Sequence, residues 1–196
     1  MPRRLAKTRD HRLLGRDFYA RPAIDVARDL LGKHLVHRRA GVIHSGRIVE
    51  TEAYIGPEDL ACHASKGLTG RTRIMYGAAG HAYVFLIYGM HNCFNVVCER
   101  EGFPAAVLVR ALEPGEGLAR TVDGPGKLCA ALHITREHNG LDLCGGDLWL
   151  EDRGEPAPEI VATPRIGIDY AGEWVAAPLR FVDGASRFLS KKLPPR

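Results

Sequence analysis

Two apolar runs flank a short turn, and this feature constrains the fold more than any other in the sequence. The runs cover residues 82–87 and 93–98, and the segment Tyr88-Gly89-Met90-His91-Asn92 separates them. Apolar runs of strand length on either side of a tight turn are typical of a β-hairpin. We therefore expect the middle of the chain to be mostly antiparallel sheet.

Neighbouring segments indicate further strands. Residues 35–55 consist of short alternating runs, interrupted at Ala40-Gly41 and again at Ser45-Gly46, which predicts several antiparallel strands. Another apolar run over residues 105–112 predicts one more strand. The Gly- and Pro-rich remainder of the chain is expected to form short strands joined by loops.

Two helices are expected beside this sheet. The first starts at Pro22 and ends at Gly32, because proline suits the first helical position and glycine favours a helix end. Its apolar face is formed by Ala23, Val26, Ala27, Leu30 and Leu31. The second opens at Gly124-Pro125-Gly126-Lys127. Helices beside an antiparallel sheet, with one protruding hairpin, predict an α+β domain.

Length and composition limit the domain count and the class of protein. A chain of 196 residues with 45% hydrophobic content predicts one domain. The longest apolar run, about seven residues, is far below the ~20 needed to cross a bilayer, and no secretory leader is recognisable. The five cysteines lack a CxxC spacing. We expect reduced thiols, no membrane association and no bound metal.

Basic residues are concentrated at both ends of the chain. The first sixteen residues contain Arg3, Arg4, Lys7, Arg9, Arg12 and Arg16, and the last residues include Lys191, Lys192 and Arg196. We predict flexible basic tails over residues 1–16 and 191–196 and a single domain over residues 17–190. Such tails raise the local concentration of a polyanion without reading sequence. Solvated, disordered termini without a partner are the alternative.

Candidate catalytic residues lie on the predicted strand 49–55. Its period of two places Glu50, Glu52 and Tyr54 on one face, with Val49, Thr51, Ala53 and Ile55 on the other. Plain solvent exposure of the acidic face is the alternative. In the strand 105–112, Arg110 interrupts an apolar run, where a charge is costly unless it meets an anion. A structural ion pair with Glu113 or Asp123 stays open.

The turn of the hairpin is chemically unusual. Tight turns normally carry small polar residues, but this one presents Tyr88 and Met90. Large apolar side chains on a rigid hairpin can enter a minor groove and unstack a base step. Packing of the aromatic ring on its own core is the alternative.

Seven segments of the sequence, in order, resemble one known family. They are residues 47–54 (RIVETEAY), 56–59 (GPED), His63, 80–92 (GHAYVFLIYGMHN), 110–114 (RALEP), 124–129 (GPGKLC) and 165–167 (RIG). Together they closely resemble the alkyladenine (3-methyladenine) DNA glycosylases, from about Asp17 to Phe181. The resemblance implies a single-domain α+β fold, no metal or cofactor, and excision of alkylated or deaminated purines from duplex DNA.

The resemblance also implies roles at the reacting centre. Glu52 matches the general base that activates a water for attack on the anomeric carbon. Arg110 and the carbonyl of Ile166 match the positions that hold this water. Tyr54 and His63 match residues that border the flipped base.

Further positions match the pocket and the DNA contacts. Phe85 falls where the family commonly has a second stacking tyrosine, so a hydroxyl is lost and substrate breadth is expected to differ. Asn95 matches a position that opposes the amino group of undamaged guanine. Tyr88 matches the side chain that fills the gap left by the flipped nucleotide, and Met90 and His91 extend this wedge.

Phosphate contacts are expected from Lys127, at the Gly-Pro-Gly helix start, and from Arg71 and Arg73. The loop after His63 holds fewer arginines than is common in the family, which weakens the prediction for Arg71 and Arg73. An ordinary exposed lysine is the alternative for Lys127.

The sequence therefore predicts a monofunctional glycosylase of base excision repair that acts on damaged double-stranded DNA as a monomer. We expect a cytoplasmic, nucleoid-associated protein, and a nuclear location stays open. Two alternatives are a non-catalytic minor-groove DNA-binding protein and a small-molecule hydrolase on the same fold.

Overall fold

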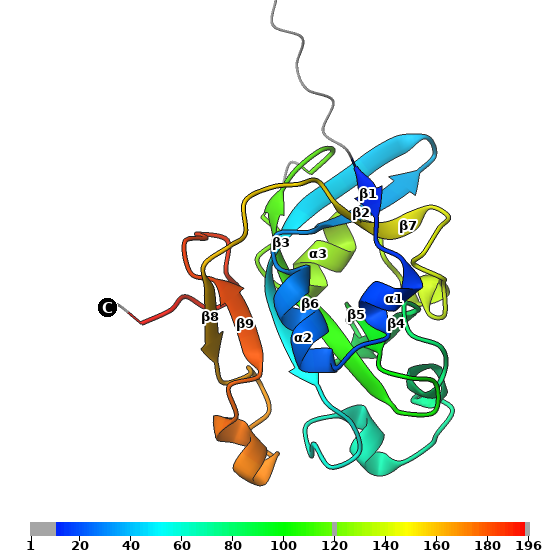
Figure 1. Cartoon of the computed structure of the whole chain (residues 1–196), viewed down its shortest axis with the longest axis vertical. Coiled ribbons are helices and arrows are strands. Elements are labelled where there is room, and N and C mark those ends of the chain that lie inside the picture. Colours follow the sequence, from blue (N-terminus) through cyan, green and yellow to red (C-terminus); the bar gives the residue numbers. More distant parts are fainter. Residues whose placement is uncertain (1–10, 119–120, 195–196) are drawn as a thin grey trace, which may run out of the picture.

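A nine-stranded antiparallel sheet with three short helices forms the α+β domain of the computed structural model, which describes residues 11–118 and 121–194 (Figure 1). The strands are β1 (Arg12–Leu13), β2 (His34–Arg39), β3 (Val42–Tyr54), β4 (Ala82–Ile87), β5 (His91–Cys98), β6 (Ala105–Pro114), β7 (Leu148–Asp152), β8 (Ile160–Thr163) and β9 (Arg180–Asp183). The helices are α1 (Arg16–Tyr19), α2 (Ala23–Leu30) and α3 (Pro125–Ala131). Single 3-10 turns, η1 (His63–Lys66), η2 (Arg73–Tyr76), η3 (Arg136–His138) and η4 (Gly172–Ala176), lie in the loops.

The long strand β3 organises the sheet, whose main order is β1-β7-β2-β3-β6-β5-β4. One edge of β3 pairs with β6. The other edge pairs first with β2 and then, at residues 50–52, with β9, which also pairs with β8. The sheet is therefore forked and curved rather than closed, and its β8–β9 pair forms a separate branch beside β3 (Figure 1). The fork brings three strands together around residues 50–52.

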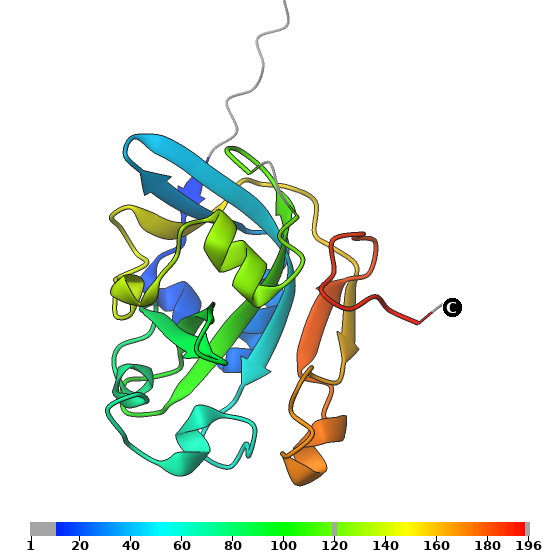
Figure 2. The same ribbon diagram turned by 180° about the vertical axis from the view of Figure 1, so that it is seen from behind.

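The helices pack where the sequence predicts them. Helix α2 buries Ala23, Val26, Ala27 and Leu30 against β3 and β6, and α3 packs against β5 and β6. The α2 helix faces the viewer in Figure 1, and α3 faces the viewer in Figure 2, where the molecule is turned by 180°. Gly32 takes a positive φ of 83° after α2, and its N–H donates to the carbonyl of Ile48 at 2.8 Å. This turn leads directly into β2.

Two expectations for β3 are wrong in detail. No break occurs at Ser45-Gly46, because β3 runs through it; a Cβ at Gly46 would lie 2.9 Å from the Cβ of Leu112, so the glycine permits close strand packing rather than a turn. Val49 does not share a face with Thr51 and Ala53. Register shifts between Ile48 and Thr51 change the alternation, so Val49 joins a separate apolar cluster. Because the shifts precede Thr51, Glu52 and Tyr54 keep the predicted face.

Both predicted tails reach too far into the domain. At the C-terminal end, the carbonyl of Lys191 accepts from Nη2 of Arg180, and Leu193 packs against an apolar cluster. Arg12–Leu13 form β1 on the edge of β7, Leu14 is buried, and Arg16 donates to the carbonyl of Ala79 and pairs with Asp142. Residues 1–10 and 195–196 lie outside the described part. Within residues 11–118 and 121–194, no helix has the length and apolar character that crossing a membrane requires.

Candidate active site

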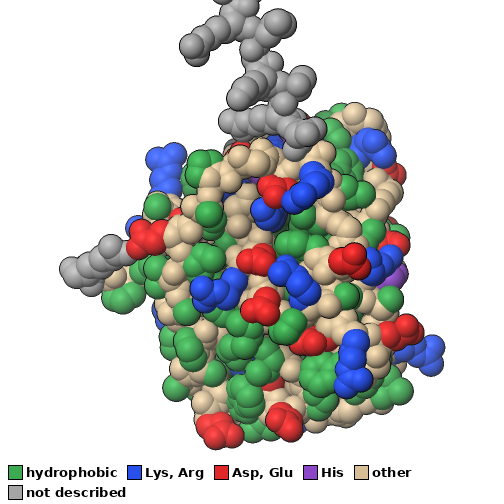
Figure 3. Space-filling view, in the orientation of Figure 1, with side chains coloured by type: hydrophobic (Ala, Val, Ile, Leu, Met, Phe, Trp, Pro, Cys, Tyr) green, Lys and Arg blue, Asp and Glu red, His purple; other side chains and the backbone are tan. Residues whose placement is uncertain are grey.

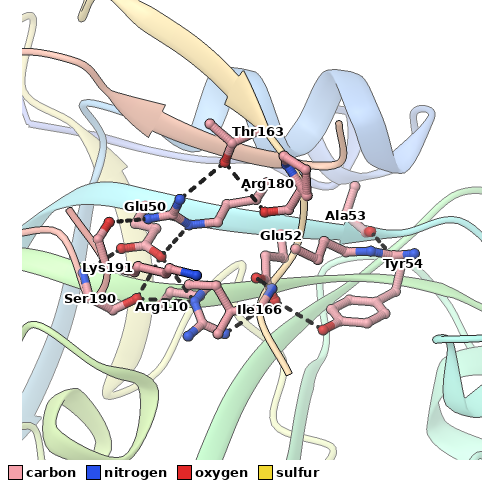
Figure 4. A network of polar contacts seen from close by, with 12 residues as sticks. Glu50, Glu52, Ala53, Tyr54, Arg110, Thr163, Ile166, Arg180, Ser190 and Lys191 are labelled. Carbon is pink, nitrogen blue, oxygen red and sulfur yellow. Dashed lines mark hydrogen bonds and ion pairs between the residues drawn. The ribbon is translucent and has the colours of Figure 1, made fainter. Parts of the chain in front are cut away.

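Glu52 is fully buried, at 0% exposure, and its carboxylate lies where three elements meet (Figure 4). Its Oε2 accepts from the hydroxyl of Tyr54 at 3.0 Å and from Nη1 of Arg110 at 3.2 Å. Its Oε1 accepts from the backbone N–H of Ile166 at 2.8 Å. Strands β3 and β6 and the loop after β8 therefore assemble the three residues predicted for the reacting centre. The alternative, plain solvent exposure of the acidic face, is wrong for Glu50 and Glu52.

The electrostatics of Glu52 suit a base. Burial raises the pKa of Glu52, while the Arg110 charge, the Ile166 N–H and the Tyr54 hydroxyl act to lower it. A carboxylate offers about four lone-pair sites, and three donors leave about one for a further ligand such as water. Burial and the Glu52 charge raise the pKa of Tyr54 well above its usual value, so its phenol remains a donor.

Arg110 and Ile166 make contacts other than those considered from the sequence. Arg110 pairs with Glu50 and Glu52, not with Glu113 or Asp123. Ile166 contacts Glu52 through its N–H rather than through the carbonyl that the resemblance singled out. The carbonyl role therefore stays a prediction.

A buried arginine fixes the loop that carries Ile166. Arg165 forms a two-pronged pair with Asp59, at 2.6 and 2.8 Å, and both side chains are 0% exposed. Its Nη1 also donates to the carbonyl of Ala53, and its guanidinium lies 4.8 Å from the ring centre of Tyr54. Paired arginine–carboxylate hydrogen bonds of this kind have a fixed geometry. The contacts of Arg165 therefore fix the position of the next residue, Ile166, beside Glu52.

A cavity of about 130 Å³ adjoins this centre: the three donors to Glu52, from Tyr54, Arg110 and Ile166, belong to residues that line it, whereas Glu52 itself does not line it. A single water needs roughly 10–15 Å³ by the same measure, so the cavity has room for a much larger group. Its wall includes all the predicted pocket residues, namely Tyr54, His63, Phe85 and Asn95, as well as Arg110 and Ile166. Most of the lining is apolar or aromatic. The site therefore fits a flat, largely apolar ligand of ring size.

Aromatic and amide groups have defined positions in the wall. His63 shares a 2.7 Å hydrogen bond with the Tyr83 hydroxyl, and its ring meets Phe85 edge to face at 4.6 Å. Burial and the nearby Arg71 charge lower the pKa of His63 to about 4, so the imidazole is neutral at pH 7. Nδ2 of Asn95 donates to the carbonyls of Tyr83 and Cys93, which fixes its amide.

The hairpin between β4 and β5 protrudes. Tyr88 is 84% and Met90 72% exposed, and His91 begins β5 beside them. Tyr88 and Gly89 both take positive φ, 52° and 68°, and the Met90 N–H donates to the Ile87 carbonyl at 3.2 Å. These are features of a type I′ turn, in which a tyrosine is strained by about 1 kcal/mol or more. The fold thus holds two large apolar side chains in solvent rather than on its own core.

The predicted phosphate contacts lie near these features. Lys127 is exposed in α3 and pairs with Asp123 at 2.8 Å. Arg71 is exposed, lies 5.0 Å from the ring centre of Phe85 and donates to the carbonyl of Leu86. Arg73 is exposed in η2. Their contact with phosphate stays a prediction.

Several residues that build the site had no role assigned from the sequence, although Glu50 was placed on the same strand face as Glu52. Glu50, Arg165, Arg180 and Asp59 form buried ion pairs around Glu52 or its supporting loop. Arg180 interrupts an apolar run just as Arg110 does, so the same reasoning would have found it. All five cysteines are free thiols, and within the described residues no cluster of three or more His, Cys, Asp or Glu could hold a metal ion.

Comparison with known proteins identifies the family of this chain. The model of the methylpurine-DNA glycosylase family matches residues 17–187, most of the chain. The chain belongs to this family. It is therefore a DNA glycosylase, an enzyme of DNA repair whose substrate is DNA.

Relatives from three organisms match over nearly their full length. A protein of Methanocella arvoryzae is 55% identical, and the match covers 93% of this chain and 98% of the relative. One from Myxococcus xanthus is 58% identical over 93% and 95% of the two chains, and one from Legionella pneumophila is 49% identical over 92% and 99%. All three are provisionally named 3-methyladenine DNA glycosylases.

Proposed function

We propose that this enzyme hydrolyses the N-glycosidic bond of a flipped, alkylated or deaminated purine in duplex DNA, with Glu52 activating the attacking water. The substrates belong to the class of 3-methyladenine, 7-methylguanine, hypoxanthine and ethenoadenine. One observation carries the proposal: the fully buried carboxylate of Glu52 accepts hydrogen bonds from three residues that line an aromatic cavity. Only an everted base could bring its sugar to such a carboxylate.

The chemistry follows from the contacts of Glu52. Its remaining lone pair accepts a proton from water as the water oxygen bonds to the anomeric carbon. The glycosidic electron pair leaves with the base, so a purine made cationic by alkylation departs neutral. Neutral lesions need a proton on the leaving base. The carboxylate charge also stabilises the positive character of the sugar in the transition state.

The cavity wall supports selection of the base. Tyr54, Phe85 and neutral His63 present flat faces or edges to an electron-poor ring, which favours alkylated purines. Asn95, fixed by two carbonyls, is the residue that we propose opposes the amino group of guanine. Phe85 offers stacking without a hydrogen bond. We further propose that the enzyme acts as a monomer on nucleoid DNA in the cytoplasm.

A glutamine variant of Glu52 tests the catalytic role. Glu52→Gln keeps the side-chain shape and an acceptor oxygen but removes the base. In single-turnover assays on duplexes with one 3-methyladenine or hypoxanthine, we expect base release to fall about 100-fold or more. Binding of the same duplexes should change less than about threefold. Glu101→Gln, which alters an exposed glutamate, is the matched control. Undiminished release by Glu52→Gln would reject the proposal.

A second variant separates a glycosylase from a small-molecule hydrolase. Tyr88→Ala removes the exposed hairpin ring, so the gap of a flipped nucleotide stays unfilled. We expect slower release from duplex DNA by about tenfold, with less effect on a lesion in single-stranded DNA. Tyr88→Phe keeps the ring and should behave as wild type. Equal rates for all three proteins on duplex DNA would contradict the proposed wedge.

A further inference from the structure

A second buried carboxylate lies two residues before Glu52 on β3. Glu50 is 0% exposed and accepts hydrogen bonds from Nε of Arg110 at 3.0 Å and from Nε of Arg180 at 2.7 Å. The backbone N–H and the hydroxyl of Ser190 add two more, each at 2.6 Å. Four donors on one buried carboxylate fix its position. Neither Glu50 nor Glu52 lines the cavity, but all three donors to Glu52 come from lining residues, whereas among the residues that donate to Glu50 only Arg110 lines it.

Opposite charges alternate through this network (Figure 4). Arg180 contacts Glu50, Glu50 contacts Arg110, and Arg110 contacts Glu52. Two cations and two anions balance, which allows the group to stay buried. Because Nε of Arg110 is bound to Glu50 and its Nη1 to Glu52, the plane of the guanidinium is fixed from both ends.

The network is closed by residues 188–191, which we call the C-terminal strap. Phe188 and Leu189 pack with an apolar cluster formed by Val49, Ala111 and Val182. The carbonyl of Lys191 accepts from Nη2 of Arg180 at 2.6 Å, next to the Ser190 contacts with Glu50. A segment more than 130 residues away along the chain thus holds Glu50 in place.

We propose that Glu50, held by Ser190 of the C-terminal strap, is a positioning residue that keeps Arg110 on Glu52 through one nitrogen only. This leaves the remaining Glu52 lone pair to the attacking water. When the Glu50 charge is lost, its hold on the Nε of Arg110 weakens and this nitrogen turns to Glu52 as well, because two N–H groups of an arginine match a carboxylate. The inference rests on the proposed role of Glu52 as base.

Removal of the Glu50 charge also changes the basicity of Glu52. The groups that face Glu52 are Arg110 from β6, Glu50 and Tyr54 from β3, Arg165 from the loop after β8 and Cys93 from β5. Burial, and to a smaller extent the Glu50 charge, raise the pKa of Glu52, while Arg110 lowers it. Neutral glutamine at position 50 therefore lowers the pKa of Glu52 and makes it a weaker base.

The test compares Glu50→Gln, Ser190→Ala and a control, Ser186→Ala, which alters a serine that contacts Phe188 instead of Glu50. Single-turnover base release is measured on a hypoxanthine duplex as a function of pH, and the Glu52 carboxyl is titrated by ¹³C NMR. Circular dichroism gives the folded fraction. For Glu50→Gln we expect a rate about 10- to 100-fold lower and an acid limb shifted to lower pH. Ser190→Ala should change both in the same direction by less, and Ser186→Ala should match wild type.

Two outcomes would overturn the inference. One is a Glu50→Gln protein that is folded and keeps the wild-type rate. The other is a rate that falls only with the folded fraction, while the Glu52 titration stays in place. If the wild type itself releases no base, the proposed function fails, and the NMR titration still decides whether Glu50 governs Glu52. If Glu50→Gln does not fold, Ser190→Ala decides by the same two readouts.

Discussion

Burial acts in opposite directions on the pKa values of Glu52, which adjoins the cavity, and His63, which lines it. It raises the pKa of the acid Glu52 and lowers that of the base His63, because both charged forms lose solvation. Glu52 recovers part of this loss through Arg110, Ile166 and Tyr54. His63 has the Arg71 charge nearby instead, which favours its neutral form further. One residue is thus prepared to hold charge and the other to avoid it.

The low pKa of His63, about 4, predicts a pH-dependent stability. Below an ordinary pKa of 6.5 the unfolded chain binds a proton at this residue and the folded chain does not, so stability falls as the pH drops from 6.5 towards 4. Since His63 is partly exposed, we discount the full shift and expect a loss of about 1 kcal/mol from this residue between pH 7 and pH 5.

Urea unfolding at pH 7 and pH 5 measures this contribution. Other histidines with lowered pKa values, among them His34 and His138, add to the slope of the wild type, so the comparison is with His63→Gln. The variant should lose less stability on acidification by about 1 kcal/mol. Equal losses in the two proteins would mean that His63 protonates as readily folded as unfolded.

The individual site residues were predictable to the extent that each carries a local signal. Glu52, Tyr54 and Arg110 stand out because a charge or phenol occurs in an apolar strand, and the structure brings them together. The pairing of Arg165 with Asp59 joins residues 106 positions apart. A local sequence pattern cannot indicate a contact between residues so far apart along the chain. The ion pair that supports the Ile166 loop could therefore be recognised only from the structure.

At the scale of elements, apolar runs in the sequence predicted the positions of the strands but not the local irregularities within them. The strands β4, β5 and β6 and the helices α2 and α3 lie where hydrophobic period and turn residues place them. The register shifts in β3 left no such pattern, because Ile48 and Val49 are both apolar and fit either face. Gly46 likewise looks like a turn residue although it lies within β3.

Gly46→Ala tests whether that glycine serves close packing. An added Cβ would meet the Leu112 Cβ at 2.9 Å and the Glu113 carbonyl at 3.0 Å, and β3 and β6 are hydrogen-bonded there and cannot separate freely. We expect a loss of about 1–3 kcal/mol in the free energy of unfolding, measured with urea. Gly70→Ala, where nothing lies within 4 Å, is the control. A neutral Gly46→Ala would show that the strands adjust.

The whole molecule presents two different faces. The face that carries α2 shows Lys and Arg mixed with Asp and Glu, with apolar side chains between them (Figure 3). Arg71 lies close to the protruding hairpin, because its guanidinium stacks over Phe85 of β4, one of the two hairpin strands. The α3 helix, which carries Lys127, faces the viewer in the opposite view (Figure 2). We therefore expect duplex DNA to lie against the hairpin and α3, away from the α2 face.

Salt dependence distinguishes these faces. Each phosphate contact releases counterions, so it adds about 0.9 to the slope of log affinity against log salt. The Lys127–Asp123 pair is exposed and contributes at most about 1 kcal/mol, so the lysine can exchange Asp123 for phosphate at little cost. Lys127→Ala and Arg71→Ala should each reduce the slope by about 1 and weaken binding to undamaged and damaged duplexes alike.

Arg28→Ala, on the exposed side of α2, is the control: it removes the same charge and should leave the slope unchanged. If instead Arg28→Ala lowers the slope and Lys127→Ala does not, the duplex binds the α2 face, and the hairpin cannot be the wedge that everts the base.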